Sequence, residues 1–209
     1  MTLKRRTYLH PPIIRVLHWV HVMAIIPAII LGFYITYPLA TPWTLLELER
    51  MLFWSLVFVY ATFVARIYLA IVWGDWRDLL INRQDLSHLP GFLSFVFFRR
   101  PVHPAYPQKY NPGQKLLFTT WFAILLGLLV TGFMLYYPAE TTYLARPLGG
   151  LPSVRLYHYL LSLALAATVP VHIYLALTED LGKLLAMFTG FVEKDYSPSR
   201  KFKVKRPRS

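Results

Sequence analysis

Two histidines near the C-terminal end of the sequence have a spacing at which their side chains could act together. His158 and His172 are 14 positions apart, which is about 1400° of rotation along an α-helix, about 40° short of four full turns. Both imidazoles would therefore project from nearly the same face of one helix, about 21 Å apart along its axis. Imidazole is a common metal ligand. The pair predicts two ligating positions at different depths of one helix.

Two further histidines lie early in the chain. His18 lies at the start of an apolar segment, and His21 follows one turn later. Ionisable side chains inside apolar segments are costly, so they are functional candidates by default. His21 is about 60° from His18 around a helix, and we interpret it as a helix–helix hydrogen-bonding residue. The others lie in polar segments and are expected to be solvated: His10, His88 and His103.

Four apolar segments must position these side chains. Each has about 22 residues, enough to cross about 30 Å of hydrocarbon as a helix; they cover residues 16–37, 52–73, 116–137 and 156–177. An open strand would leave its backbone groups unpaired in lipid, so helix is the only sensible assignment. With 56% hydrophobic residues and a mean hydropathy of +0.44, the sequence predicts an all-α integral membrane four-helix bundle.

The basic residues predict how this bundle is oriented. Lys and Arg gather before the first segment, between the second and third, and in the tail, whereas the first and third connections hold only Arg50, Arg146 and Arg155. Basic connections favour the cytoplasmic side. Both termini and the long connection, residues 74–115, are therefore predicted to be cytoplasmic. His18 and His172 would then share the inner depth and could hold one haem between them, with His158 near the outer face.

Composition excludes several classes of function. The net charge is +12, but the charges flank the apolar segments, which indicates topology signals and contacts with membrane lipid rather than nucleic acid binding. The chain has no cysteine, so disulfides, iron–sulfur clusters and covalently attached haem are excluded, and any cluster must belong to another subunit. The first apolar segment is long and lacks a small-residue cleavage site, so it is predicted to be a retained signal anchor.

The chain divides into a predicted four-helix haem-binding domain, residues 1–196, and a basic cytoplasmic tail, residues 197–209, expected to be flexible. Within the long connection, residues 89–98 are predicted to form a short helix at the membrane surface. The alternative is a loop packed on its own subunit.

Five motifs spread over nearly the whole chain are similar to those of a known family. They are Arg-Val-Leu-His-Trp at 15–19, Arg-Ile-Tyr at 66–68, Tyr-Asn-Pro-Gly-Gln-Lys at 110–115, Val-Thr-Gly-Phe at 130–133 and His-Ile-Tyr-Leu-Ala-Leu at 172–177. The chain thus resembles the cytochrome b subunits of membrane-bound nickel–iron hydrogenases and the related gamma subunits of respiratory formate dehydrogenases, in the bacterial cytochrome b561-like family. Glu-Asp at 179–180 favours the hydrogenase branch and Asn-Pro-Gly-Gln at 111–114 the dehydrogenase branch.

The resemblance implies a multi-pass protein of the bacterial or archaeal cytoplasmic membrane that binds one or two haems b. It would be an electron-transfer and quinone-reducing subunit of a respiratory complex, not catalytic alone. Electrons would pass from the iron–sulfur and catalytic subunits of a hydrogenase or formate dehydrogenase to quinone. His18, His172 and His158 would be the iron ligands.

One departure from the family concerns the outer haem, whose second ligand is a histidine near the start of helix two. Residues 46–56 contain no histidine, and Met51 is the only residue there that could ligate iron. A methionine in an apolar helix is more often a packing residue. The outer haem would therefore be His/Met ligated, ligated elsewhere or absent.

The resemblance also implies a quinone site next to the inner haem, near the start of helix three. Asn111 and Gln114 could hydrogen-bond a quinone carbonyl there, or could be a helix cap and a solvated amide. Arg15 and Arg66 could pair with haem propionates or could be positive-inside anchors. An electron donor on the cytoplasmic side, at the long connection and tail, is a variant of the same function.

Two other functions are compatible with apolar helices that carry histidines. In a haem-free membrane anchor the histidines would be structural, each bonded to a neighbouring helix. A small transporter would need broken helices or an inverted repeat around a midplane site. The segments are continuous and show no repeat, which argues against the transporter.

Overall fold

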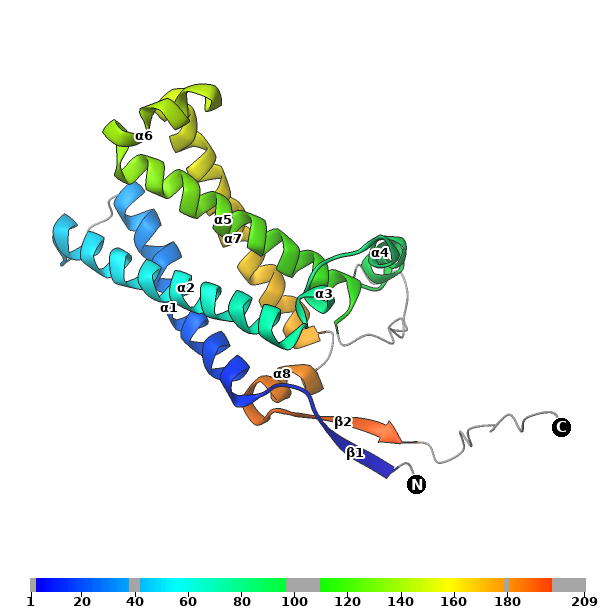
Figure 1. Ribbon diagram of the computed structural model, residues 1–209. Coiled ribbons are helices and arrows are strands. Elements are labelled where there is room, and N and C mark those ends of the chain that lie inside the picture. Colours follow the sequence, from blue (N-terminus) through cyan, green and yellow to red (C-terminus); the bar gives the residue numbers. More distant parts are fainter. Residues whose placement is uncertain (1–2, 38–41, 97–109, 179–180, 197–209) are drawn as a thin grey trace.

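Four long helices dominate the computed structural model, which describes residues 3–37, 42–96, 110–178 and 181–196. They are α1 (Pro12–Thr36), α2 (Leu45–Trp73), α5 (Pro112–Tyr136) and α7 (Gly150–Thr178) (Figure 1). Each is long and apolar enough to cross a membrane. The four predicted spans are therefore confirmed, and each helix begins four to seven residues earlier than its predicted segment.

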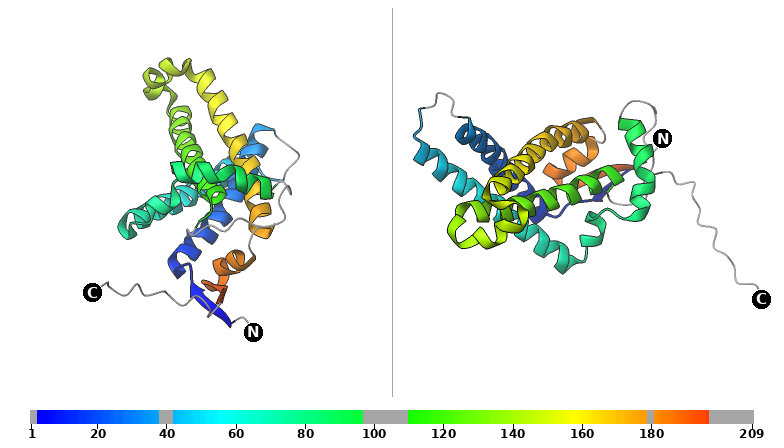
Figure 2. Two further views of the ribbon diagram at one scale, coloured as in Figure 1. Left: turned by 90° about the vertical axis from the view of Figure 1, so that its right-hand side faces the viewer. Right: turned by 90° about the horizontal axis from the view of Figure 1, so that it is seen from above.

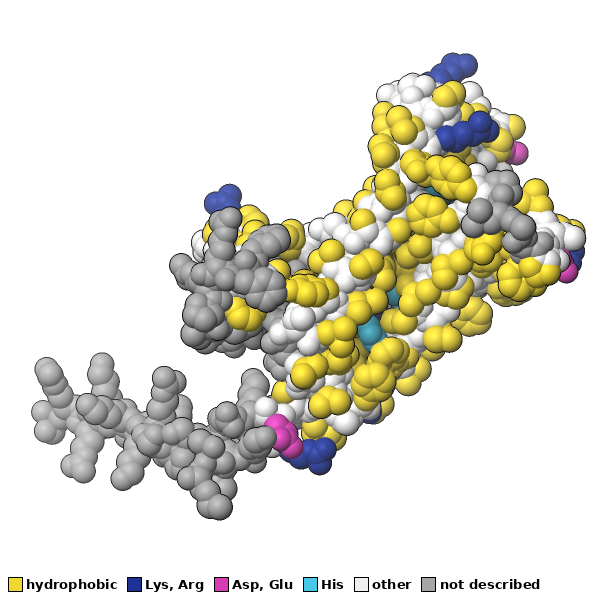
Figure 3. Space-filling view, turned by 180° about the vertical axis from the view of Figure 1, so that it is seen from behind, with side chains coloured by type: hydrophobic (Ala, Val, Ile, Leu, Met, Phe, Trp, Pro, Cys, Tyr) yellow, Lys and Arg dark blue, Asp and Glu magenta, His cyan; other side chains and the backbone are white. Residues whose placement is uncertain are grey.

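The four helices form two antiparallel hairpins, because α1 packs mainly along α2 and α5 mainly along α7. The hairpins meet midway along their length in one buried cluster, which contains Ala24, Ile25, Val59, Ile124, Leu125 and Leu165. Tyr60 Oη donates to the Leu125 carbonyl at 3.2 Å and so joins α2 to α5. Most other apolar side chains face outward and cover the flank of the bundle, with charged side chains at its ends (Figure 3). Such a surface suits lipid.

Local signals set where the long helices begin and end. At the start of α2, Thr44 Oγ1 accepts from the Glu47 amide at 3.3 Å, and the Glu47 carboxylate accepts from the Thr44 amide at 2.8 Å. This reciprocal pair satisfies two amides that have no partner within the helix. Gly74 ends α2 in the left-handed conformation, with φ of 73°, which glycine adopts without steric cost.

The first and last described segments pair with each other. β1 (Leu3–Tyr8) and β2 (Phe191–Tyr196) form an antiparallel ribbon in which Tyr8 is opposite Phe191. α8 (Leu181–Thr189) joins α7 to this ribbon. We call the end of the bundle where α1 begins and α7 ends the terminal end (Figure 1). The bundle is all-α as predicted, but this ribbon was not predicted. That the terminal end is cytoplasmic stays a prediction.

The opposite end carries the connection between α5 and α7. It consists of α6 (Pro138–Ala145) and the 3-10 turn η1 (Arg146–Leu148), and we call it the α6 end. Thr141 Oγ1 donates to the Met134 carbonyl at 3.0 Å, which folds α6 back onto the end of α5. Met134, Ala145 and Val154 form a second, smaller buried cluster there.

The long connection contains two helices, α3 (Trp76–Leu79) and α4 (Arg83–Val96). α4 begins six residues before the predicted helix, since Asn82 and Asp85 cap its start: each side chain accepts from the other's amide, at 2.9 and 3.0 Å. It lies across the beginning of α5 (Figure 2). Phe92 packs there so closely that a Cβ on Gly113 would lie 2.1 Å from its ring.

α4 is thus a helix, as predicted, but it packs on its own chain, as the alternative interpretation proposed. Its position at the membrane surface stays a prediction. Residues 97–98 of the predicted helix and the basic tail, residues 197–209, lie outside the described residues, so the division at residue 196 also stays a prediction.

Candidate functional site

His18 and His172 face each other at the terminal end. His18 lies in the second turn of α1, and His172 lies six residues before the end of α7. Because α1 begins where α7 ends, the two residues reach the same depth from different hairpins. Their ring centroids are 6.4 Å apart, and both side chains are half-buried. The predicted shared depth is therefore seen in the structure.

This separation is compatible with two imidazoles that would ligate a single iron. A bond from a metal to an imidazole nitrogen is about 2.0–2.1 Å long, so rings on opposite sides of one metal have centroids about 6 Å apart. Haem supplies four nitrogens of its own, so two histidines complete the coordination. No group of three or more His, Cys, Asp or Glu residues that could hold a bare metal ion occurs in the described part of the chain. The residues therefore fit a bis-histidine haem.

Aromatic side chains hold the two imidazoles. Trp121 of α5 packs against His172 with centroids 5.1 Å apart, and its indole nitrogen donates to Thr168 Oγ1 at 2.8 Å. That hydrogen bond anchors the Trp121 ring to α7, one turn before His172. The Trp19 ring lies 5.2 Å from His18. The contact between Trp121 and His172 was not predicted, because pairing across helices leaves no local sequence signal.

His158 lies towards the α6 end, on the opposite half of α7. Its Nδ1 is 2.8 Å from Thr131 Oγ1, and that hydroxyl donates to the Gly127 carbonyl at 2.7 Å. Nδ1 is therefore engaged with this hydroxyl, whereas Nε2 is not part of the bond. If Nδ1 is the donor, Nε2 carries the lone pair that an iron-ligating histidine needs. Gly132 leaves room for the ring, since a Cβ there would be 3.3 Å from His158 Cε1.

Met51, the predicted second ligand for an outer haem, lies in the second turn of α2 and is half-buried. α2 packs along α1, whereas His158 belongs to the hairpin of α5 and α7. Met51 and His158 therefore belong to different hairpins, as His18 and His172 do. Ligation by Met51 stays a prediction.

The other histidines have varied surroundings. His21 Nδ1 is 2.7 Å from Thr62 Oγ1 of α2, so the predicted helix–helix hydrogen bond is confirmed. His88 is exposed, as expected. The expectation that His10 is solvated is wrong, because it is only 8% exposed where the chain turns from β1 into α1 beside α8. His103 lies outside the described residues.

Asn111 and Gln114 cap the start of α5. Asn111 Oδ1 accepts from the Gln114 amide at 2.7 Å, and Gln114 Oε1 accepts from the Asn111 amide at 3.3 Å. The predicted cap is confirmed, but Gln114 is half-buried rather than solvated. Their role towards quinone stays a prediction. Sequence reasoning missed the next residue, Lys115, whose Nζ lies 3.1 Å from Asp85 Oδ2 in a pair with side chains 3% and 2% exposed.

The two predicted propionate-binding arginines both contact protein groups. Arg15 Nη1 donates to the Phe188 carbonyl at the end of α8. Arg66 Nη2 lies 3.2 Å from Asp75 Oδ2. The nearby Tyr110 lies before the start of α5, and burial raises the pKa of its phenol to about 12, although Arg66 acts in the opposite direction. Binding of propionates by either arginine stays a prediction.

Four membrane-length helices with paired imidazoles at one depth define a haem-binding membrane protein of the four-helix class. A family model described as prokaryotic cytochrome b561 matches residues 9–190, and the chain belongs to this family. It is therefore a multi-pass membrane cytochrome b of prokaryotic type, a class that binds haem b and transfers electrons. The predicted family resemblance is confirmed.

Curated relatives point to the same class. The chain is 28% identical over 190 residues to the Escherichia coli K12 protein described as "Formate dehydrogenase, cytochrome b556(fdo) subunit". The alignment covers 85% of this chain and 82% of that protein. Proteins of E. coli O6:H1 and O157:H7 with the same description match with the same identity and coverage.

Proposed function

We propose that this chain carries electrons from an iron–sulfur partner subunit, through haem b, to quinone. The observation that carries the proposal is the 6.4 Å separation of the His18 and His172 ring centroids. The E. coli relative is by its description a formate dehydrogenase subunit, and it aligns over 82% of its length. This relationship supports a partner complex of the formate dehydrogenase or hydrogenase type.

The residues at the terminal end would bind and orient the cofactor. His18 and His172 would hold the haem iron through one imidazole nitrogen each, one from each hairpin. Trp121, anchored through Thr168, would fix the orientation of the His172 ring. Haem b bound there supplies a one-electron couple of its iron. The apolar and aromatic surroundings would exclude water from that couple.

We also propose a second haem at His158. Its support is the hydrogen bond between His158 Nδ1 and Thr131 Oγ1, which orients the ring and does not involve Nε2. The described part of the α6 half of the bundle has no further histidine. The second ligand would then be Met51 or a group elsewhere. A relay of two haems would let an outer donor reach the inner side of the membrane.

Quinone would be reduced beside the inner haem, near Asn111 and Gln114. Each of these side chains caps the other's amide at the start of α5, and the proposed quinone carbonyl would lie beside this cap. The anchor and transporter alternatives are less well supported. Membership of a cytochrome family argues against a haem-free anchor, and α1, α2, α5 and α7 are continuous, unlike the broken helices of transporters.

The inner haem is tested on the purified full-length protein by a reduced-minus-oxidised absorbance spectrum. The wild-type protein should show a low-spin b band, and His18→Ala or His172→Ala should each lose one such centre while still inserting into membranes. His88→Ala changes an exposed histidine outside the four long helices and is the matched control. Full haem retention in both ligand variants would contradict the assignment.

Topology is tested by labelling, and the absence of cysteine makes single-cysteine reporters clean. Leu148→Cys reports on the α6 end, and Gln84→Cys reports on the start of α4. Impermeant thiol reagents added outside intact cells should label Leu148→Cys and not Gln84→Cys. The reverse pattern would place the terminal end outside and invert the proposed electron path.

A further inference from the structure

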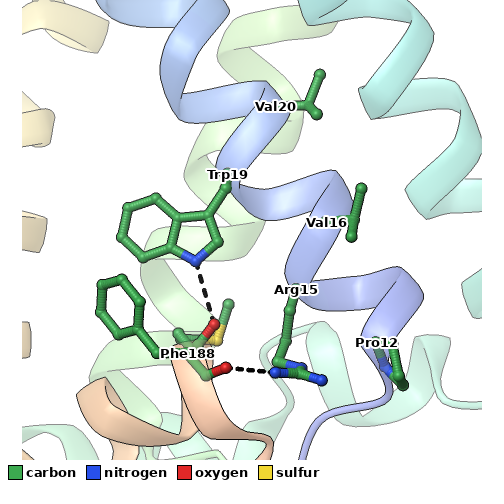
Figure 4. A pocket seen from close by; sticks show the side chains of 7 residues that line it. Pro12, Arg15, Val16, Trp19, Val20 and Phe188 are labelled. Carbon is green, nitrogen blue, oxygen red and sulfur yellow. Dashed lines mark hydrogen bonds between the residues drawn. The ribbon is translucent and has the colours of Figure 1, made fainter.

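A groove of about 370 Å³ lies between the first turns of α1 and the end of α8 (Figure 4). It is lined by Pro12, Arg15, Val16, Trp19, Val20, Met187 and Phe188. Val16 and Val20 each lie two positions from His18, about 160° away around the helix. The valine wall of the groove therefore lies on the flank of α1 opposite the proposed haem ligand.

Apolar side chains form one wall of this groove and continue beyond it. Val16, Val20 and Met23 follow one another at i, i+4 and i+7 along α1, and Met23 is 74% exposed. This stripe runs from the groove towards the middle of the bundle. It provides a track of the length and polarity that a hydrocarbon chain could lie against.

The only charged side chain that lines the groove is Arg15. Its Nη1 donates to the Phe188 carbonyl, and its Nε is buried without a hydrogen-bond partner among the residues that the structure describes. A guanidinium group in an otherwise apolar groove favours an anionic acceptor, which would bind its accessible nitrogens and not the buried Nε. Figure 4 shows Arg15 extending along α1 to the level of Pro12 and Phe188.

The surrounding chain fixes the position of Arg15. Trp19 Nε1 donates to the Met187 carbonyl at 3.1 Å, and its ring packs on Phe188 with centroids 4.6 Å apart. Gly190 turns the chain from α8 into β2 with φ of 86°, and a Cβ there would lie 3.5 Å from Arg15 Cζ. Residues of α1, of α8 and of the turn into β2 therefore fix the shape of the groove.

We propose that this groove binds one anionic phospholipid. Its phosphate accepts hydrogen bonds from Arg15, and an acyl chain lies along Val16, Val20 and Met23. The groove lies where the apolar part of α1 begins, at the depth of lipid headgroups, and indole rings such as that of Trp19 favour this depth. The chain's net charge of +12 favours an anionic headgroup over a zwitterionic one.

The test is native mass spectrometry of the full-length, haem-loaded protein. Delipidated protein is given an equimolar mixture of phosphatidylglycerol and phosphatidylcholine with identical acyl chains. Wild-type protein should retain one phosphatidylglycerol in preference to phosphatidylcholine. Arg15→Gln should weaken that retention about tenfold, as expected for the loss of a charge-assisted hydrogen bond. Val16→Trp, which fills the groove, should also abolish it without removing the charge.

Two control variants change similar side chains outside the groove. Arg77→Gln removes an exposed arginine of α3, and Val72→Trp enlarges a valine that is 57% exposed near the end of α2. Both should retain the lipid as the wild-type protein does. Equal retention of the two lipids, or wild-type retention in both Arg15→Gln and Val16→Trp, would overturn the proposal.

Two competitors distinguish other sources of the same chemistry. Inorganic phosphate at millimolar concentration should not displace the lipid, because it lacks the acyl chain. Displacement by phosphate alone would show an anion site and overturn the lipid assignment. Retention of added quinone in place of phosphatidylglycerol, lost in the same two variants, would overturn it as well.

Discussion

At the terminal end, His18 and His172 come from different hairpins and face each other with ring centroids 6.4 Å apart; towards the α6 end, His158 is bonded within its own hairpin, to Thr131. The hairpins do touch at the α6 end, where Tyr37 Oη lies 3.1 Å from Tyr159 Oη. That contact joins two phenols and not two metal ligands. The comparison teaches that the facing imidazoles of His18 and His172 require both hairpins, whereas the side-chain hydrogen bond of His158 stays within one hairpin.

The two ends also differ in how firmly their connections are attached. At the terminal end, α4 is held on α5 by the buried pair of Asp85 and Lys115, and α8 is held on α1 through Trp19 and Arg15. At the α6 end, α6 is attached by threonine hydroxyls and small apolar contacts. The end with the complete histidine pair is thus the end with the more extensive polar support.

The largest expected effect is on the number of haems per chain, which substitutions at either end of the bundle should lower. Pyridine haemochrome quantitation should give two haems per wild-type chain and one per chain in His172→Ala or in His158→Ala. Met51→Leu tests the second outer ligand, since His/Met ligation raises the reduction potential. If Met51 ligates, this variant should lose the high-potential component. A wild-type count near one that neither His158→Ala nor Met51→Leu lowers would exclude the outer haem.

The next effect concerns the buried ion pair. Lys115→Met would leave the Asp85 carboxylate buried without its cation, which should cost about 3–5 kcal/mol of the free energy of unfolding. Arg66→Met removes a cation from a more exposed pair, with side chains 25% and 21% exposed, and should cost about 1 kcal/mol or less. Unfolding in detergent by SDS titration measures both.

A second substitution sharpens this test. Adding Asp85→Leu to Lys115→Met removes the unpaired charge and should recover part of the lost free energy of unfolding. The recovery should be incomplete, because Asp85→Leu also removes the hydrogen bond that the Asp85 carboxylate accepts from the Asn82 amide. If Lys115→Met were no more harmful than Arg66→Met, the pair would not be the main attachment of α4.

A smaller effect is expected at the turn between α8 and β2. Gly190→Ala would hold alanine at φ of 86° and place its Cβ 3.2 Å from the His10 carbonyl oxygen. A non-glycine residue in this conformation costs about 1–2 kcal/mol. Gly32→Ala is the control, because nothing lies within 4 Å of its Cβ and its helix would gain from alanine. Equal stability of the two variants would show that the turn does not support the terminal end.

The sequence was sufficient to predict features that depend on local pattern. Hydropathy and length determine the four spans, and helical spacing together with the direction of each span brings His18 and His172 to one depth. The cap at Asn111 and Gln114 is likewise a short-range motif. These features could be predicted because each depends on residues within one segment, or on the fact that successive spans cross the membrane in opposite directions.

Features that depend on contacts between distant segments could not be predicted. Asp85 and Lys115 are 30 positions apart and look like ordinary polar residues of a connection. β1 is rich in basic residues, and its partner strand begins 183 positions after β1 ends. His10 is buried only because α8 and β2 return to the start of α1. None of these pairings leaves a periodic signal in either segment alone.

The smallest effect compares the two threonines that are hydrogen-bonded to a histidine, Thr131 to His158 and Thr62 to His21. Thr131→Val and Thr62→Val each remove one interhelical hydrogen bond, which should cost about 0.6 kcal/mol on average. Measurements of stability therefore do not separate the two variants, but the haem spectrum should.

If His158 ligates iron, Thr131→Val removes the hydrogen bond that orients its ring and should shift the reduction potential of the outer haem. Thr62→Val should leave every haem band unchanged, because His21 is bonded between α1 and α2 and is not a proposed ligand. Equal spectral shifts in both variants would contradict the different roles proposed for His158 and His21.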